Sequence, residues 1–181
     1  VVASANALNM YLEKETDALM QRTADRPLPA GRLAPPWALA AGFVYGIIGV
    51  SVLALWTTPM TTVLSGLSLV LYVGVYTPMK RHSPLALAVG AIPGAAPPLL
   101  GWTAATGTVD GPGLVLFAVL FLWQMPHFLA ISLFRKADYA RAGMKTVPII
   151  RGDRAARLQA LAYATALLPI SLMLIPLGTV G

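Results

Sequence analysis

The distribution of charge along this chain constrains its fold more than any other feature of the sequence. The 13 lysines and arginines fall into three windows, residues 14–32, 80–81 and 135–157. The stretches between these windows, 33–79 and 82–134, carry no charged residue except Asp110. Each stretch is too long for one crossing of a bilayer, which takes about 20 apolar residues, and suits two crossings. Because a pair of crossings returns the chain to its starting side, all three basic windows are predicted to share one membrane face.

Composition supports the same interpretation. The chain is 57% hydrophobic and only 11% charged, with a mean hydropathy of +0.71, whereas about 25% of the residues of a soluble domain are charged. The net charge of +6 could indicate nucleic-acid binding, but its confinement to short windows favours the positive-inside rule, which makes the basic face cytoplasmic. Cysteine is absent, which excludes disulfides and thiolate metal sites.

The apolar segments predict an all-α, polytopic transmembrane helical bundle. The predicted helices cover residues 1–20, 34–56, 61–78, 84–104, 113–134 and 156–178. The apolar part of the first segment is too short to cross the hydrocarbon core, so we expect the chain to begin inside a transmembrane helix. Residues 1–181 are thus predicted to be a single transmembrane domain, truncated at both ends. Small residues such as Gly42, Gly90 and Gly94 would let helix backbones approach closely.

The first basic window contains the pattern that points most directly to chemistry. Asn9, Glu13 and Asp17 recur every four residues, which places them on one face of a helix. All three side chains offer oxygen, the ligand that suits Mg²⁺ or Mn²⁺. Three arginines follow around a proline-containing turn, at positions 22, 26 and 32. Carboxylates for a metal beside arginines for phosphate oxygens favour a diphosphate site; the alternative is the solvated charged face of an amphipathic helix.

The other two windows have simple explanations when each is taken alone. Tyr76, Lys80 and Arg81 resemble the anchors that position a helix end at a membrane interface. Asp138 stands among four cations in an ordinary positive-inside loop. Taken together, however, the three windows gather oxygen ligands and cations on one face of the membrane. This convergence favours a functional site there.

Polar residues also occur within a predicted membrane span. Trp123, Gln124 and His127 lie late in the segment 113–134. An ionisable or amide side chain inside a membrane is a functional candidate, because burying it without a partner is costly. The alternative is a histidine that is satisfied by a neighbouring helix.

Three segments resemble a known family: ASANALNMYLEKETDALMQRTADRPLPAGRL (3–33), YTPMKRHSPLALAVGAIPGAAPPLLGW (76–102) and LFLWQMPHFLAISLFRKADYARAG (120–143). The chain resembles the UbiA superfamily of intramembrane prenyltransferases along essentially its whole length. Within that superfamily it is most similar to the protoheme IX farnesyltransferase (heme O synthase) branch. The resemblance implies a partial UbiA-like prenyltransferase fold, a transmembrane bundle without its first and last helices.

The resemblance also implies roles for individual residues. The first metal motif matches Asn9, Glu13 and Asp17, and one acid of the second motif matches Asp138; these four would hold Mg²⁺ and, with Lys80, make up the catalytic set. The diphosphate would be bound by Arg22, Arg26, Tyr76, Lys80 and Arg81. Two departures stand out: Glu13 occupies a position where many members carry aspartate, and Phe134 stands where the second motif would carry its other acid.

The implied reaction is the transfer of farnesyl from farnesyl diphosphate to a vinyl group of heme B, giving heme O, with heme contacts from Trp123, Gln124 and His127. The implied setting is the bacterial inner membrane with a cytoplasmic active face, a lipid bilayer around the chain, no nucleic acid, and association with other heme-biosynthesis or oxidase-assembly membrane proteins. One alternative is a UbiA-type prenyltransferase that acts on a quinone or chlorophyll precursor. Others are a non-catalytic transporter and a heme-binding assembly subunit.

Overall fold

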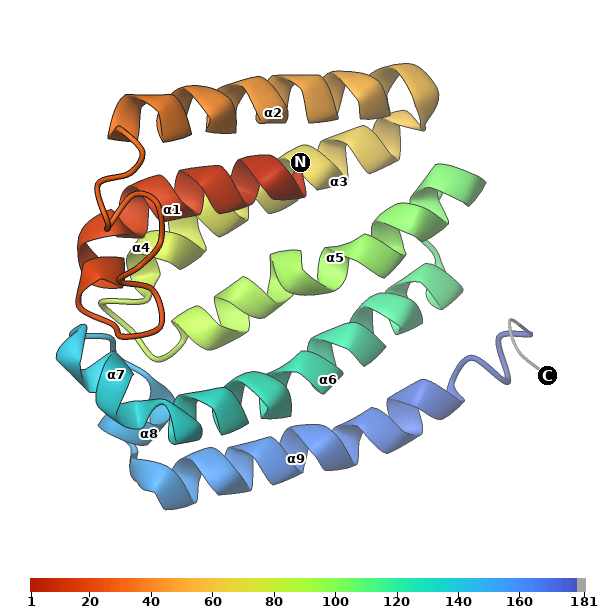
Figure 1. Ribbon diagram of the computed structural model, residues 1–181. Coiled ribbons are helices and arrows are strands. Elements are labelled where there is room, and N and C mark those ends of the chain that lie inside the picture. Colours follow the sequence, from red (N-terminus) through yellow and green to blue (C-terminus); the bar gives the residue numbers. More distant parts are fainter. Residues whose placement is uncertain (179–181) are drawn as a thin grey trace.

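The computed structural model describes residues 1–178, and all secondary structure in that range is helical, as predicted (Figure 1). The long helices are α1 (Val2–Ala18), α2 (Pro35–Trp56), α3 (Pro59–Val70), α5 (Ala86–Thr106), α6 (Gly111–Phe134) and α9 (Gly152–Leu172). A π-helical segment, η1 (Leu71–Tyr76), and the short α4 (Thr77–Met79) continue α3. Two short helices, α7 (Lys136–Arg141) and α8 (Val147–Ile150), connect α6 to α9.

The helix limits differ most from expectation near the third basic window. Helix α9 begins at Gly152, before the predicted start at 156, and ends at Leu172, before the predicted end at 178. The prediction began at the apolar stretch, whereas the helix also includes Asp153 and Arg154 before it, which are exposed. Helices α7 and α8 were not predicted, because their few residues carry too short an apolar pattern to be recognised.

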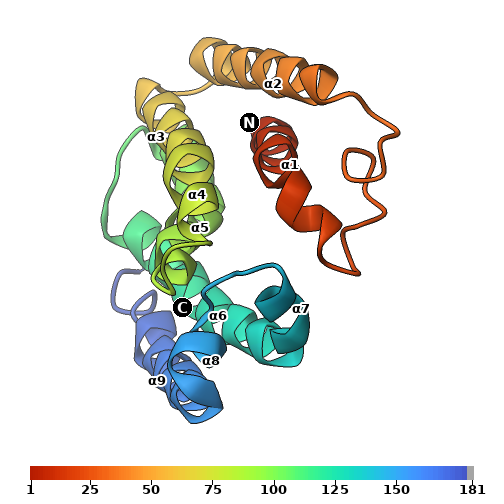
Figure 2. The ribbon, with the colours of Figure 1, turned by 90° about the vertical axis from the view of Figure 1, so that its left-hand side faces the viewer.

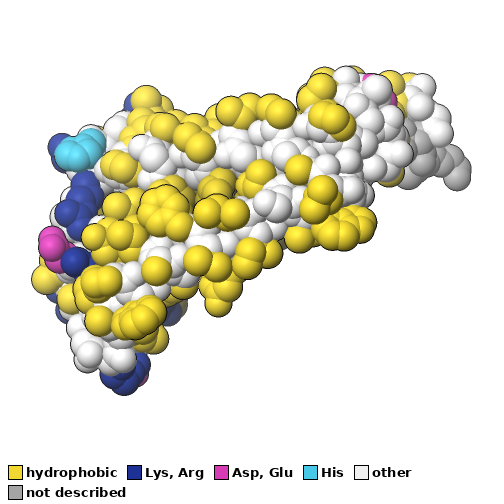
Figure 3. All heavy atoms as spheres, turned by 90° about the horizontal axis from the view of Figure 1, so that it is seen from above, with side chains coloured by type: hydrophobic (Ala, Val, Ile, Leu, Met, Phe, Trp, Pro, Cys, Tyr) yellow, Lys and Arg dark blue, Asp and Glu magenta, His cyan; other side chains and the backbone are white. Residues whose placement is uncertain are grey.

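Within residues 1–178, four helical segments are long and apolar enough to cross a membrane: Pro35–Trp56, Pro59–Met79, Gly111–Phe134 and Gly152–Leu172. Large apolar side chains on these helices point outward; Ile47, Leu55 and Leu168 are each more than 60% exposed. On the face shown in Figure 3, lysine and arginine side chains gather at one end of the molecule. This arrangement agrees with the prediction that the basic windows share one side.

The helices form an arc when viewed from their charged end (Figure 2). Helix α6 packs between α5 and α9, while α1 packs against α2 and against the α3–η1–α4 segment. Helices α1 and α6 make no direct contact with each other within residues 1–178. The two walls that these helices form are therefore joined through other elements.

Polar contacts between small residues connect neighbouring helices. The Ser4 hydroxyl donates to the Gly42 carbonyl at 2.7 Å. The Thr61 and Thr103 hydroxyls are hydrogen-bonded to each other at 2.8 Å, near the end of the bundle that lies away from the charged end. A Cβ atom at Gly42 would lie 2.6 Å from the Leu8 side chain. The close approach of α1 and α2 therefore requires glycine at this position, as the sequence indicated.

The loops at the charged end of the bundle contact one another. Met20, which follows α1, packs with Ala142, Met144 and Tyr139 from the connection after α6. The backbone N–H of Lys145 donates to the Lys80 carbonyl at 3.2 Å. These contacts hold together three loops that are far apart in the sequence, and they position the side chains described next.

Candidate functional site

A cavity of about 730 Å³ opens at the charged end of the bundle. Its walls come from α1 and the loop that follows it, from η1 and the loop after α4, from the start of α5, and from the end of α6 and the connection that follows it. Eight of the residues singled out from the sequence line it: Asn9, Glu13, Asp17, Arg22, Arg26, Tyr76, Lys80 and His127. These eight come from the first two basic windows with their flanking residues and from the span 113–134, and Arg135 and Lys145 of the third window line the cavity as well.

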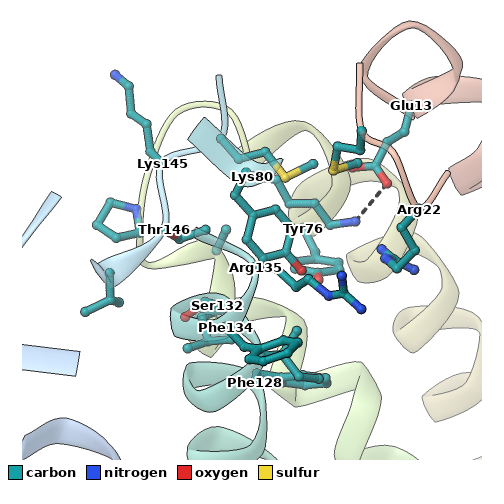
Figure 4. A pocket seen from close by; sticks show the side chains of 18 of the residues that line it. Glu13, Arg22, Tyr76, Lys80, Phe128, Ser132, Phe134, Arg135, Lys145 and Thr146 are labelled. Carbon is teal, nitrogen blue, oxygen red and sulfur yellow. Dashed lines mark hydrogen bonds and ion pairs between the residues drawn. The ribbon is translucent and has the colours of Figure 1, made fainter. Parts of the chain in front are cut away.

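The polar face of α1 forms one wall of the cavity. Asn9, Glu13 and Asp17 are all buried, with 8%, 7% and 2% of their surface exposed. Because they are spaced by four residues on a regular helix, their side chains lie in one row. Lys80 approaches this row from the opposite side: its Nζ lies 2.9 Å from Glu13 Oε2 and 3.3 Å from Asn9 Oδ1 (Figure 4). The middle residue of the row, Glu13, thus forms a partly buried ion pair with Lys80.

The loop after α1 folds back toward Asp17. Arg26 donates from Nη1 to Asp17 Oδ2 at 2.8 Å, and the buried Thr23 hydroxyl donates to the Asp17 carbonyl at 2.8 Å. Arg32 does not join this group, because it binds Asp25 on the surface of the same loop. That contact lowers the pKa of the Asp25 carboxyl below its ordinary value. Of the three arginines in this window, therefore, only Arg22 and Arg26 line the cavity.

The π-helical segment η1 shapes the wall from which Lys80 extends. Pro78 has no N–H to donate to the carbonyl one turn earlier, and widening of the helix just before it relieves the steric conflict. The Thr77 hydroxyl lies 2.8 Å from the Tyr72 carbonyl and 3.0 Å from Asn9 Oδ1, so η1 is joined to α1. Lys80 Nζ also lies 4.5 Å from the centre of the Tyr76 ring, within the range of a cation–π contact.

Glycine at position 90 determines where the Tyr76 ring can lie. A Cβ atom at Gly90 would overlap that ring, so the aromatic side chain packs directly on the backbone of α5. The Tyr76 ring in turn supports the Lys80 ammonium group. The sequence indicated Gly90 only as a position of close helix approach. Its contact with a residue of the site is visible only in the structure.

Four of the predicted site residues do not line the cavity. Arg81 is exposed, and Asp138 pairs with Arg141 within α7. Gln124 is buried between helices, where its Nε2 donates to the Ala91 carbonyl at 2.7 Å. Trp123 is exposed and stacks on His127, with ring centres 5.3 Å apart. The structure therefore brings the oxygen-bearing row of α1 together with Arg22, Arg26 and Lys80, but not with Arg81 or Asp138.

The cavity also contains residues that the sequence did not single out. Several come from the end of α6 and from the connection to α9: Phe128, Ile131, Ser132, Arg135, Lys145 and Thr146. Phe134, noted in the sequence only as a departure from the second motif, lines the cavity as well. Thr146 Oγ1 is buried and has no hydrogen-bond partner within residues 1–178. Arg135 belongs to the third basic window, whose cations looked like ordinary interface charges. No spacing in the sequence distinguishes it from its neighbours.

The donor set on α1 suits a hard divalent cation. It consists of one amide oxygen and two carboxylates, and Mg²⁺ prefers oxygen ligands, usually with oxygens of its substrate or of water completing the shell. Among residues 1–178, no cluster of three or more His, Cys, Asp or Glu side chains could hold a metal by itself. A metal bound here would therefore need the Asn9 amide oxygen, and oxygens supplied from outside the chain.

The comparison with known proteins identifies the family. The model of the UbiA prenyltransferase family matches residues 1–181. The chain belongs to that family. It is 55% identical to the protoheme IX farnesyltransferase of Anaeromyxobacter sp. (strain Fw109-5), and the match covers 100% of this chain and 61% of the relative. It is 52% identical to that of Sorangium cellulosum (strain So ce56), over 100% and 65% of the two chains.

A third relative, the protoheme IX farnesyltransferase of Myxococcus xanthus (strain DK1622), is 47% identical over 99% of this UbiA-family chain and 61% of the relative. The chain thus spans less than two thirds of the length of these curated relatives. No solved structure matches it.

Proposed function

We propose that the whole protein transfers the farnesyl group of farnesyl diphosphate to a vinyl group of heme B, which gives heme O. The observation that carries this proposal is the cavity itself. In it, the oxygen ligands of α1 face Lys80 and Arg26, and the wall next to them is apolar and aromatic. The identity of about half of the residues with protoheme IX farnesyltransferases supports heme as the acceptor.

The polar wall would bind the diphosphate. Asn9, Glu13 and Asp17 offer the oxygens for Mg²⁺, and Lys80, Arg22 and Arg26 offer cations for the phosphate oxygens. When bound there, Mg²⁺ would neutralise charge that develops on the departing diphosphate. The C1–O bond of the farnesyl group breaks, and its electron pair leaves with the diphosphate. Donors that are already in place lower the barrier, because they need no reorganisation as the charge develops.

Tyr76 and Arg81 complete the proposed diphosphate set, each in a different way. The Tyr76 ring lies under the Lys80 ammonium group and fixes its position. Arg81 lies outside the cavity, so it would contribute to the electrostatic potential of the mouth and not through direct contact. The Asp138 carboxylate, bound to Arg141, stays a prediction of the sequence.

The apolar wall would hold the farnesyl chain and the acceptor. Phe128, Ile131 and Phe134 line it. The partly buried Phe128 and Ile131 would exclude water from the allylic cation until the acceptor attacks, whereas Phe134 is largely exposed. A vinyl carbon of heme B forms the new bond to C1. Water then adds to the cation left on the other vinyl carbon and releases a proton, which gives the hydroxyethylfarnesyl group.

His127 is the proposed contact to the heme, through the iron or a propionate. It lines the cavity and lies parallel to Trp123, whose exposed ring extends the flat aromatic surface. Gln124 belongs to the same proposal, although its amide N–H already donates to the carbonyl of Ala91. Heme spectra of a His127→Ala variant test this assignment; an unchanged spectrum would remove it.

The chain has the multi-pass helices of an integral membrane protein. We place the protein in a bacterial inner membrane with the cavity mouth toward the cytoplasm, because lysine and arginine gather around that mouth.

The deciding experiment uses the full-length protein in lipid nanodiscs with heme B, farnesyl diphosphate and Mg²⁺. We expect heme O, identified by mass, and we expect Asp17→Asn to abolish its formation while Arg154→Gln, which alters an exposed arginine outside the cavity, leaves it intact. Prenylation of 4-hydroxybenzoate in place of heme B would favour the quinone-precursor alternative. Full activity of Asp17→Asn would contradict the proposed role of α1.

A further inference from the structure

Two arginines in the cavity wall have no acidic partner. Arg22 follows α1 and Arg135 follows α6, and within residues 1–178 neither side chain forms an ion pair or donates a hydrogen bond. The neighbouring cations Arg26 and Lys80 differ, because each is bound to a carboxylate of α1. In Figure 4 the guanidinium groups of Arg135 and Arg22 extend toward the same space, beside the Lys80–Glu13 pair.

The position of Arg135 is well defined. Its N–H donates to the Ile131 carbonyl at 2.8 Å, and its own carbonyl accepts from the Tyr139 N–H at 3.1 Å, so its backbone is held by α6 and α7. The guanidinium carbon lies 5.2 Å from the centre of the Phe134 ring, within the range of a cation–π contact. These contacts direct the side chain along the cavity wall.

The helix dipole alone does not account for this placement. The carboxyl end of α6 attracts a cation, but this attraction does not determine the direction in which the cationic side chain extends. Lys136 lies at the same helix end and extends outward instead, to bind Asp153 at 2.6 Å. Arg135, the preceding residue, instead lines the cavity and has no carboxylate partner within residues 1–178.

Like charges that converge from two walls repel each other unless an anion lies between them. A diphosphate meets this requirement, because its oxygens accept the paired N–H groups of a guanidinium. We propose that Arg135 is a diphosphate-binding residue, which grips from the α6 side the group that Arg22 grips from the α1 side. The inference rests on the proposed function in taking a diphosphate as the ligand. Since α1 and α6 do not touch, the bound diphosphate would link them.

The test measures binding of inorganic pyrophosphate with Mg²⁺ to the full-length protein in nanodiscs, by calorimetry and without heme. Loss of a hydrogen-bonded charge predicts that Arg135→Gln raises the Kd about 10- to 100-fold. Arg135→Lys, which keeps the charge but loses the planar fork, should fall between this variant and the wild type. Arg154→Gln is the matched control, since Arg154 is exposed and lies outside the cavity, and its Kd should not change.

Wild-type affinity in Arg135→Gln would overturn the inference, and a simultaneous loss of heme B affinity would instead assign the arginine to the acceptor's carboxylates. If Arg135→Gln does not fold, Arg135→Lys decides, and an unchanged Kd again overturns the inference. A wild-type protein that binds pyrophosphate in an Arg135-dependent way but makes no heme O would refute the proposed acceptor and leave this inference standing. Failure of the wild type to bind pyrophosphate would refute both.

Discussion

Replacing Lys80 with methionine should strengthen the binding of a divalent metal and weaken the binding of diphosphate. The Lys80 ammonium group lies 2.9 Å from Glu13 Oε2 and 3.3 Å from Asn9 Oδ1. It therefore occupies the space that a metal bound by these two oxygens would need. Without diphosphate, the ammonium group and the metal compete. With diphosphate bound, the same ammonium group is free to turn toward the phosphate oxygens.

The size of the competition follows from the geometry of the pair. At 2.9 Å and an effective dielectric constant of about 20, the Coulomb attraction is about 6 kcal/mol. Desolvation opposes it, since both side chains are less than one-fifth exposed. A hydrogen bond between charged groups retains about 1.5 to 3 kcal/mol net. Removing the lysine should thus tighten metal binding by about 10- to 100-fold.

The assay is a titration of Mn²⁺, followed by electron paramagnetic resonance, with wild type and Lys80→Met. Lys136→Met is the matched control, because Lys136 pairs with Asp153 on the outer surface and does not line the cavity. Pyrophosphate binding is measured in parallel and should change in the opposite direction. If Mn²⁺ binds Lys80→Met no more tightly than wild type, then Glu13 and Asn9 are not metal ligands and the reasoning fails.

Three further predictions concern other parts of the site and its support. Asp138→Asn should leave the Mn²⁺ affinity unchanged while Asp17→Asn lowers it at least tenfold, because only Asp17 lines the cavity; equal losses would contradict this geometry. Gly90→Ala should lower the transfer rate by displacing the Tyr76 ring, with a thermal unfolding scan as the check that the bundle survives. Gln124→Leu should cost about 1 kcal/mol of stability, since its amide is bound between helices; an unchanged heme spectrum in this variant would remove Gln124 from the proposed heme contacts.

The membrane bundle and the row on α1 could be predicted because each depends on a local pattern. Long uncharged stretches can cross a bilayer only as helices, whatever the rest of the chain does. A spacing of four residues places Asn9, Glu13 and Asp17 on one face of any regular helix. The comparison of all three basic windows then predicted one charged end, and the structure gathers lysine and arginine there.

The remaining features depend on contacts between distant segments, which no local pattern encodes. Arg135 and Lys136 are adjacent cations in the same stretch of sequence, yet Arg135 lines the cavity and Lys136 binds Asp153 outside it. Gln124 satisfied the criteria for an intramembrane functional residue, but whether its amide faces a ligand or a neighbouring carbonyl depends on the approach of α5. The π-helical segment at Leu71–Tyr76 changes the direction of Tyr76 without altering the apolar pattern.

The separation of α1 from α6 connects these observations. The two buried carboxylates of α1, Glu13 and Asp17, are paired with Lys80 and Arg26, cations of their own half, so they need no counterion from α6. In the second half, Arg135 lines the cavity and has no carboxylate partner within residues 1–178. At the mouth, the halves meet through apolar contacts of Met20 and Met144 and through the backbone hydrogen bond from Lys145 to Lys80, and within residues 1–178 no ion pair joins them. A polyanion that enters between the two halves would therefore be attracted by both walls at once. Lys80 and Arg26, which pair with the carboxylates of α1, could then also bind its oxygens.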